Sequence, residues 1–349
     1  MHQKWIGIHD HSDSAVRWLD AGVSYTWLRA FEQAQGVETV AYLREHHYRR
    51  DLEIPVRGVR YCFRNTEFPD WAEAIISERP SLILYNLCYY KAGAPIIRRL
   101  REALPGTLHV IRIHHQVTYL AAHEGFAESV LACDVAIAPT PGQIPAVRDL
   151  GFRGPVHALP FGIDAEVMAR TARHFRERDF DLVCACNSHP ARNRSVVEAV
   201  LEVLKSRGRR VCNFQDMTRP ELAAGLGRAK TFWLSSLTEA SGSRIMPEAI
   251  AAGCYPIAFE ECFTAEELLQ TMGVGSVIRS GIAYDYRTKT TAVPDSAVAD
   301  LADKLDAIIA QRDAVPDWTP APLARAYHEH HEVADLTALL REVGAQPRP

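Results

Sequence analysis

The sequence predicts an α/β protein made of two consecutive doubly wound parallel sheets. Three observations support this: the length, a regular alternation of apolar runs with amphipathic segments, and a charged interruption of that alternation. The chain has 349 residues, of which 47% are hydrophobic and 23% charged. At roughly 100–200 residues per domain, this length favours two domains. Alternating strands and helices imply right-handed crossovers and parallel sheets that are covered on both faces.

The first half of the chain contains the first set of alternating elements. Lys4–Ile8 is a strand candidate, and Trp27 and Phe31 follow it at helical spacing. Short apolar runs predict the later strands, and amphipathic periodicity predicts the helices between them. Strands are expected at Val40–Leu43, Val59–Phe63, Ser81–Tyr85, His109–Ile113 and Asp134–Ala138, and helices at Trp71–Ile75, Ile96–Leu104 and Phe126–Leu131.

The segment Ala165–Asp179 interrupts this alternation, because it is charged and lacks strand character. We therefore expect the connection between the two domains there. The alternation then resumes to the end of the chain. Strands are expected at Phe180–Cys186, Arg210–Phe214, Thr231–Ser235 and Tyr255–Phe259, and helices at Val196–Leu204, Leu222–Leu226, Ala249–Ala252, Ala265–Leu269, Leu301–Ile308 and Pro322–Val343. Ligands of such sheets bind outside the carboxyl ends of the strands, so the site is expected in a cleft that the two sheets face.

Charge and composition exclude several classes of protein. Lys and Arg total 39 against 43 Asp and Glu, a formal charge of −4, which disfavours a protein that coats nucleic acid or an anionic membrane. No apolar stretch reaches the roughly eighteen residues of a membrane span, and no signal-peptide pattern is present. We expect a cytoplasmic protein, and contact with a membrane surface stays open. The eight cysteines predict reduced thiols, and their spacing does not predict a metal site.

The segment Ser235–Phe259 carries the most specific chemical pattern. Glu239 precedes a loop of small residues, Ala240–Ser243, and a short helix with a second acid, Glu248, opens near Pro247 and ends at Gly253. Small residues before a helix expose backbone N–H groups that suit a diphosphate. A carboxylate can accept both hydroxyls of a ribose. The pattern therefore predicts a nucleotide-binding segment.

This segment resembles the signature of retaining glycosyltransferases of glycosyltransferase family 4, which have the GT-B fold. Glu248–Pro256 matches the family's E-A-x-A-x-G-x-P, although eight residues separate the two acids where the family has seven. Leu159–Asp164 resembles the turn I-P-N-G-V-D, with Phe161 in place of Asn. Cys133–Thr140 resembles the preceding A-D-x-V strand, and Cys186–Asn193 occupies the place of G-R-x-x-x-x-K-N.

The resemblance implies a fold, a reaction and a separate binding role for each domain. It implies an acceptor-side domain of residues 1–165, joined by a returning C-terminal helix of residues 318–349, and a nucleotide-sugar-binding domain of residues 166–317. It implies metal-independent transfer of a sugar, with retention, from a UDP- or GDP-sugar to an acceptor hydroxyl. The nucleotide-sugar is a co-substrate and no cofactor is implied. No nucleic-acid partner is expected.

The resemblance also implies roles for individual residues. His114, Glu239 and Arg192 are the implied catalytic residues. Because Asn187 replaces the family's Arg, we expect Arg194 or Arg244 to supply the second cation for the diphosphate. The implied donor-binding residues are Asn187, Arg192, Arg194, Ser241, Gly242, Ser243, Arg244 and Glu248, and the acceptor-side residues are His9, Asp10, His11, Arg112 and His115.

Other interpretations stay open at this point. The chain could be a GT-B sugar-nucleotide 2-epimerase, which would release UDP without an acceptor. It could equally be an inactive nucleotide-binding partner subunit, as the charge loss at Asn187 suggests. The acids could be solvated surface groups and His114 a satisfied core histidine. Tyr327–Glu332 lacks metal-ligand order and is expected to form a solvated helical face.

Overall fold

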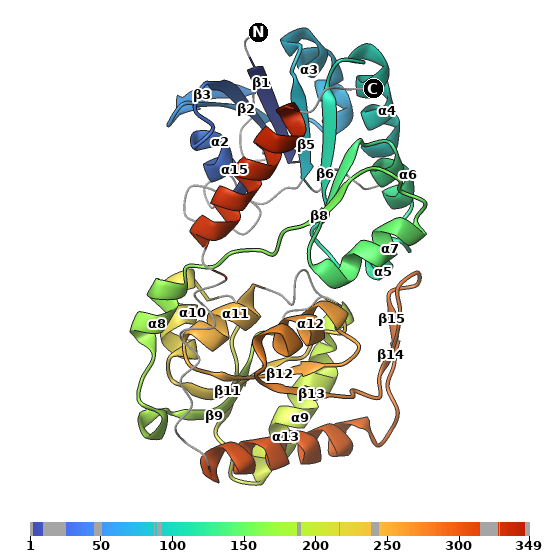
Figure 1. Cartoon of the computed structure of the whole chain (residues 1–349). Helices are drawn as coiled ribbons and strands as arrows, with labels where there is room; N and C mark the ends of the chain where they lie inside the picture. Colours follow the sequence, from blue (N-terminus) through green and yellow to red (C-terminus); the bar gives the residue numbers. More distant parts are fainter. Residues whose placement is uncertain are drawn as a thin grey trace. The chain divides into compact units, whose positions relative to one another are not determined.

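The computed structural model of the chain describes residues 3–9, 26–44, 51–86, 88, 93–186, 190–215, 217–238, 244–314, 327 and 329–345. The chain divides into two compact units (Figure 1). Unit 1 comprises Met1–Gly162 and His330–Pro349, and unit 2 comprises Ile163–Glu329. Each unit contains one mainly parallel sheet with helices on both faces, which confirms the predicted fold class.

The sheet of unit 1 has the order β3-β4-β2-β1-β5-β6-β7-β8. Its neighbouring strands are parallel, except that β3 runs antiparallel to β4. The strands are β1 (Gln3–His9), β2 (Val37–Arg44), β3 (Leu52–Val56), β4 (Val59–Arg64), β5 (Leu82–Asn86), β6 (Leu108–Arg112), β7 (Val135–Ala138) and β8 (Val156–Ala158).

The antiparallel edge of this sheet was missed by the sequence prediction. Strands β3 and β4 are joined by Arg57 and Gly58, both of which have positive φ, 48° and 85°. Two positive-φ residues between paired strands form a tight hairpin turn, for which a glycine is the usual signal. Residues Leu52–Val56 alternate between half-buried and exposed, so they give only a weak apolar run.

Helices cover both faces of the unit 1 sheet. One face packs against α2 (Thr26–Glu32) and α15 (Glu329–Ala345), which lie side by side in Figure 1 although some 300 residues separate them. On the other face, Trp71 stacks on Tyr42 of β2, and α3 (Ala72–Glu78) begins directly after Trp71. The remaining helices of unit 1 are η2 (Phe68–Trp71), α4 (Gly93–Ala103), α5 (Val117–Leu120), α6 (Phe126–Leu131), η3 (Pro141–Gln143) and α7 (Ile144–Asp149).

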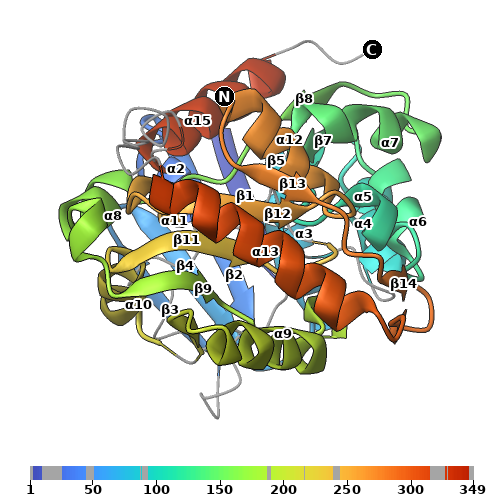
Figure 2. The ribbon, with the colours of Figure 1, turned by 90° about the horizontal axis from the view of Figure 1, so that it is seen from below.

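Unit 2 has a parallel five-stranded sheet of order β10-β9-β11-β12-β13. Figure 2 shows α13 and α9 on one face of it, and α8, α10, α11 and α12 supply the other core. Its elements are α8 (Ala165–Thr171), η4 (Phe175–Glu177), β9 (Phe180–Cys184), η5 (Pro190–Arg192), α9 (Arg194–Ser206), β10 (Val211–Asn213), α10 (Arg219–Leu226), β11 (Ala229–Leu234), α11 (Ile245–Ala251), β12 (Tyr255–Phe259), α12 (Phe263–Met272), β13 (Ser276–Ile278), the hairpin β14 (Ala283–Asp285) and β15 (Thr290–Ala292), and α13 (Ala297–Ala314).

The prediction that Ala165–Asp179 connects the domains was wrong. This segment opens with helix α8 inside unit 2, and the division between the units falls after Gly162. The Asp164 carboxylate caps the helix by accepting a hydrogen bond of 3.0 Å from the N–H of Val167. Ala165 and Met168 are buried in the unit 2 core. Of the charges that suggested a linker, Glu166 and Arg170 lie on the exposed side of the helix, whereas Arg178, beyond the helix, is buried.

The return of the chain to unit 1 occurs later than the sequence suggested. Unit 1 resumes at His330, whereas the sequence placed the returning helix at 318–349. Helix α15 packs Val333, Leu336 and Leu340 into the core of unit 1.

No described helix is long and apolar enough to span a membrane. All eight cysteines are free.

A buried carboxylate anchors the amino end of the unit 2 sheet. Asp181 accepts hydrogen bonds of 2.9 Å from the backbone N–H and from Nη2 of Arg210, and its Oδ1 lies 3.0 Å from Nζ of Lys230. Burial alone would raise the pKa of Asp181, but these partners outweigh it and lower the pKa from 3.8 to about 2. Asp181 therefore stabilises unit 2 above pH 4, and the stabilisation disappears as the pH falls through 2.

We predict that Asp181→Asn lowers the free energy of unfolding at pH 7 by about 2 kcal/mol, the value that such a pKa shift represents. The difference from wild type should shrink between pH 4 and pH 2. Urea denaturation at a series of pH values measures it. Asp303→Asn is the matched control, because Asp303 forms an exposed pair with Arg207 and should cost little at any pH. A pH-independent loss in Asp181→Asn would contradict the prediction.

Candidate functional site

The carboxyl edge of the unit 1 sheet carries a row of polar side chains. His9, Asn86 and Arg112 end the adjacent strands β1, β5 and β6, and the register pairs His9 with Asn86 and Asn86 with Arg112. Residues in register point to the same face of a sheet. On this face the strands present apolar residues such as Leu84 and Val110 until their last position. The polar row therefore begins where the core ends, as expected for a ligand-binding edge.

His114 follows this row, two residues beyond β6. Its side chain is buried, and its Nε2 lies 3.3 Å from Oδ1 of Asn86. Its ring centroid lies 5.0 Å from that of Phe161. The neighbouring His115 is half-buried and makes an edge contact with Tyr119. Asn86 is in register with His9 and contacts His114, so the three residues lie at the same edge of the sheet.

The contacts of His114 with Asn86 and Phe161 were not predicted from the sequence. Asn86 lies one residue beyond the predicted strand Ser81–Tyr85, and the rule that ligands bind at the carboxyl ends of parallel strands could have found it. Phe161 was noted only as a departure from the family turn. Asp10 and His11 lie outside the described residues.

Arg112, which the resemblance places on the acceptor side, is buried in an ion pair. Its guanidinium and the Glu332 carboxylate form an ion pair, and each side chain is only 1% exposed. Glu332 also accepts hydrogen bonds from Oγ1 of Thr26, at 2.5 Å, and from the N–H of Gly162, at 2.6 Å. The expectation of a solvated face is therefore wrong for Glu332. Sequence periodicity could not reveal a partner that lies 220 positions away.

The loop after β9 in unit 2 holds Arg192 at the carboxyl end of the second sheet. Asn213 fixes Cys186 at the start of this loop, accepting from the Cys186 N–H at 2.8 Å and donating to its carbonyl at 3.1 Å. Arg192 is half-buried, and its Nη1 donates to the carbonyl of Ala185 at 3.4 Å. Arg194 instead lies on the exposed side of α9 and pairs with Glu198 at 2.7 Å. Asn187 lies outside the described residues.

Glu248 and Arg244 form a second buried pair beside the carboxyl end of β11. Glu248 lies on α11, and its Oε1 is 3.5 Å from Nε of Arg244, with side chains 6% and 7% exposed. A carboxylate buried to this degree is rare unless it has a partner or a ligand. The pair brings together two of the predicted donor-binding residues. Glu239, Ser241, Gly242 and Ser243 lie outside the described residues.

Arg178 fixes the other end of α11, and no sequence signal pointed to it. Its guanidinium donates to the carbonyls of Ala229, at 2.6 Å, Ala252, at 3.2 Å, and Gly253, at 2.7 Å. A Cβ at Gly253 would lie 2.3 Å from Nη2 of Arg178, and Gly253 has φ of 84°, so only glycine fits there. Burial lowers the pKa of Arg178 from its ordinary value. The predicted helix end at Gly253 is confirmed, and Arg178 holds the helix that carries Glu248.

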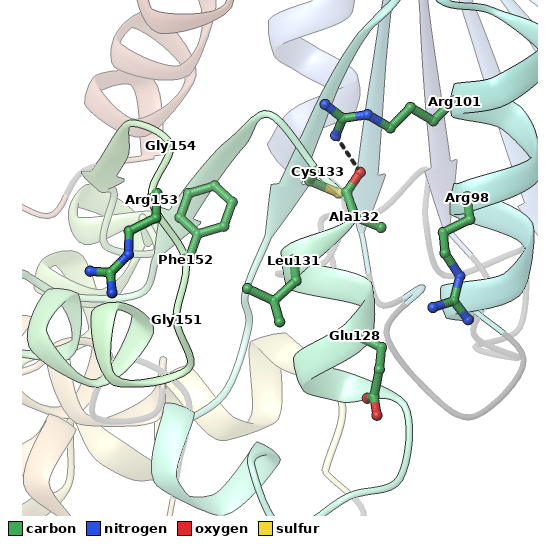
Figure 3. Close-up of a pocket in the computed structure, with 10 residues that line it drawn as sticks. All are labelled: Arg98, Arg101, Glu128, Leu131, Ala132, Cys133, Gly151, Phe152, Arg153 and Gly154. Atoms are coloured by element: carbon green, nitrogen blue, oxygen red, sulfur yellow. Dashed lines mark hydrogen bonds between the residues drawn. The ribbon is translucent and has the colours of Figure 1, made fainter.

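A cavity of about 560 Å³ lies elsewhere in unit 1, between α4, α6 and the loop before β8 (Figure 3). Cys133 and Gly154 precede β7 and β8, so this cavity lies at the amino end of the sheet. Arg101 is tied down there by a hydrogen bond to Ala132 and an ion pair with Asp134. None of the predicted site residues lines it. Its lining comprises Arg98, Arg101, Glu128, Leu131, Ala132, Cys133, Gly151, Phe152, Arg153 and Gly154.

Metal ligands do not gather in the part of the chain that the structure describes. There, no group of three or more His, Cys, Asp or Glu side chains is arranged to hold an ion.

Solved structures resemble this chain along nearly its whole length. A sucrose-phosphate synthase from Thermosynechococcus elongatus matches with a TM-score of 0.69 and 15% identity, covering 99% of this chain and 100% of the other. A UDP-forming α,α-trehalose-phosphate synthase from Burkholderia vietnamiensis matches with a TM-score of 0.67, 14% identity and coverage of 97% and 100%. HepE of Anabaena, solved with UDP and glucose, matches with a TM-score of 0.65, 10% identity and coverage of 98% and 100%.

No family model matches the sequence, and no curated protein matches it. At identities of 10–15%, the structural likeness shows the fold. The chain is an α/β protein with two parallel sheets, and it matches GT-B glycosyltransferase structures from end to end.

Proposed function

We propose that this protein is a retaining glycosyltransferase of the family 4 type, which moves a sugar from a nucleoside-diphosphate sugar to an acceptor hydroxyl without a metal ion. The buried pair of Glu248 and Arg244 carries the proposal. It lies at the carboxyl end of the second sheet, and Glu248 is the first residue of the stretch that resembles the family's E-A-x-A-x-G-x-P. Two matched structures support UDP as the nucleotide, one UDP-forming and one solved with UDP and glucose.

The donor binds through residues of unit 2 in this proposal. Glu248 accepts the two ribose hydroxyls, since its two oxygens match a vicinal diol. Arg244 pairs with that carboxylate and orients it when no nucleotide is bound. Arg192 faces the diphosphate and stabilises the negative charge that develops as the sugar leaves. Glu239, Asn187 and the amides of Ser241–Ser243 complete this donor set by resemblance.

The sugar end of the donor is assigned to His114 in unit 1. Its imidazole, held beside Asn86, is a hydrogen-bonding group for a sugar hydroxyl. The acceptor attacks the face that the nucleotide leaves, the C–O bond to the phosphate breaks, and the departing phosphate takes the acceptor proton. Retention follows from this same-face attack. His9, Asp10, His11 and His115 are the proposed acceptor-side residues.

A thermal-shift panel with UDP, GDP, ADP, dTDP and their sugars tests the proposal. A ligand at about 100 times its Kd stabilises a protein by about 2.7 kcal/mol, which gives a clear rise in Tm. We expect UDP or GDP and the matching sugar nucleotide to raise the Tm. If none of the nucleotides shifts the Tm, the proposed function is wrong.

Two variants make this panel specific for the donor site. In Glu248→Ala the nucleotide-induced rise in Tm should largely disappear, because the ribose loses its acceptor. Glu202→Ala is the matched control, since Glu202 lies on the exposed side of α9 and pairs with Lys205. Its nucleotide response should equal that of wild type. An unchanged response in Glu248→Ala would remove Glu248 from the donor site.

A further inference from the structure

Phe161 occupies a position where the resembled family carries Asn, and its aromatic ring makes contacts that an Asn side chain could not make. The side chain is only 3% exposed. Cζ of Arg112 lies 4.7 Å from the centroid of its ring, within the range of a cation–π contact. The His114 ring lies 5.0 Å away at an interplanar angle of 37°. Phe161 therefore contacts both a buried cation and the histidine assigned to the sugar.

Glu332 fixes this arrangement from the returning helix α15. One of its oxygens accepts from the N–H of Gly162, the residue directly after Phe161, and the other pairs with Arg112. The carboxylate thus holds the backbone beside Phe161 and the cation on its ring. It does so at the point where the chain leaves unit 1, after Gly162, and close to where it returns, at His330.

The contacts form a continuous series that ends on His114. Glu332 orients Arg112 and the turn at Gly162, these fix the Phe161 ring, and that ring bounds one side of the imidazole. Asn86 holds the same imidazole through its Nε2. An asparagine at position 161 would offer neither the flat apolar surface nor the aromatic face for Arg112.

We propose that Phe161 and Glu332 are positioning residues that set the orientation of the His114 ring. The consequence for catalysis rests on the proposed function. A ring turned away from the sugar would weaken the transition state while leaving the nucleotide bound by unit 2. Small misplacements of a positioned group reduce turnover by up to about 100-fold.

The test uses the full chain with Phe161→Leu, Phe161→Tyr and Glu332→Gln. Thr337→Val is the matched control, because Thr337 is also buried on α15 but bonds to the carbonyls of Val333 and Ala30. The first readout is the NMR signal of the His114 ring, assigned by its loss in His114→Asn. The second is the release of UDP from UDP-glucose, with kcat and KM measured separately.

We expect Phe161→Leu and Glu332→Gln to shift the His114 signal and to lower kcat by about tenfold, with KM for UDP-glucose nearly unchanged. Phe161→Tyr keeps the ring and should restore both values, and Thr337→Val should lower only the Tm. A His114 signal that is unchanged in Glu332→Gln and Phe161→Leu would overturn the proposal. Failure of wild type to bind any nucleotide of the thermal-shift panel counts against the proposed function, and the NMR comparison still decides the positioning roles.

Discussion

Replacing Glu332 with Leu is expected to lower the free energy of unfolding of unit 1 by about 3–5 kcal/mol, the cost of leaving a buried charge without its partner. The ion pair with Arg112 is 1% exposed on both sides, so water cannot solvate the guanidinium that remains. The N–H of Gly162 and the hydroxyl of Thr26 would also lose their acceptor. Urea denaturation measures the loss, and hydrogen exchange locates it in unit 1.

Removing the charge from both partners separates this cost from a general packing defect. The double variant Arg112→Leu/Glu332→Gln leaves no buried charge and keeps an amide oxygen for Gly162 and Thr26. It should be more stable than either of its single variants, Arg112→Leu and Glu332→Gln, because a neutral pair avoids the desolvation penalty. A double variant whose loss equals the sum of the two single losses would show that the charges are not coupled.

Replacing Arg192 with Ala is expected to lower kcat/KM for the sugar nucleotide by about 10²–10³, as the loss of one preorganised donor to a developing anion does elsewhere. Arg192 is half-buried at the carboxyl end of the unit 2 sheet, and its Nη1 donates to the carbonyl of Ala185, the residue before Cys186, which Asn213 holds. In the proposed reaction it faces the departing diphosphate. Steady-state kinetics with the nucleotide sugar identified by the thermal-shift panel measure the effect.

A second variant at position 192 separates the effect of the positive charge from that of the planar guanidinium. Arg192→Lys keeps the charge but loses the planar fork, so its activity should lie between those of wild type and Arg192→Ala. Lys205→Ala is the matched control, because Lys205 is an exposed cation on α9 that pairs with Glu202. It should change kcat/KM by less than about fivefold, the effect of a surface pair. Equal activities of Arg192→Ala and Lys205→Ala would exclude Arg192 from the diphosphate site.

The fold class could be predicted because its signals are local. Apolar runs such as Leu82–Asn86 and Tyr255–Phe259 are buried along their length apart from the half-buried Tyr255, and the stripe from Val196 to Leu204 follows the helical period. Short edge elements such as β3 and β13 were missed, because an exposed or three-residue strand gives little apolar periodicity. Helix α8 was missed because surface charges hid the two residues that it buries, Ala165 and Met168.

The same distinction between local and long-range signals applies to the residues of the candidate site. The motif around Glu248 could be found in the sequence, because the residues of a helix and its flanking loops are neighbours in the chain. The ion pair with Arg244 spans only four positions, within reach of one helical turn. The contacts of Phe161 and Arg178 had no local signal, since each residue acts through groups brought to it from other elements.

The sequence by itself determined the two parallel sheets, the helices between them, and the residue types offered at the carboxyl ends of the strands. Hydrophobic periodicity and glycine positions act over a few residues, so they can be read without the fold. Only the tertiary structure decided that Glu332 is buried, that it neutralises Arg112, and that Phe161 contacts His114. A charge is stable in a core only beside its partner, and the chain must fold before residues 112 and 332 meet.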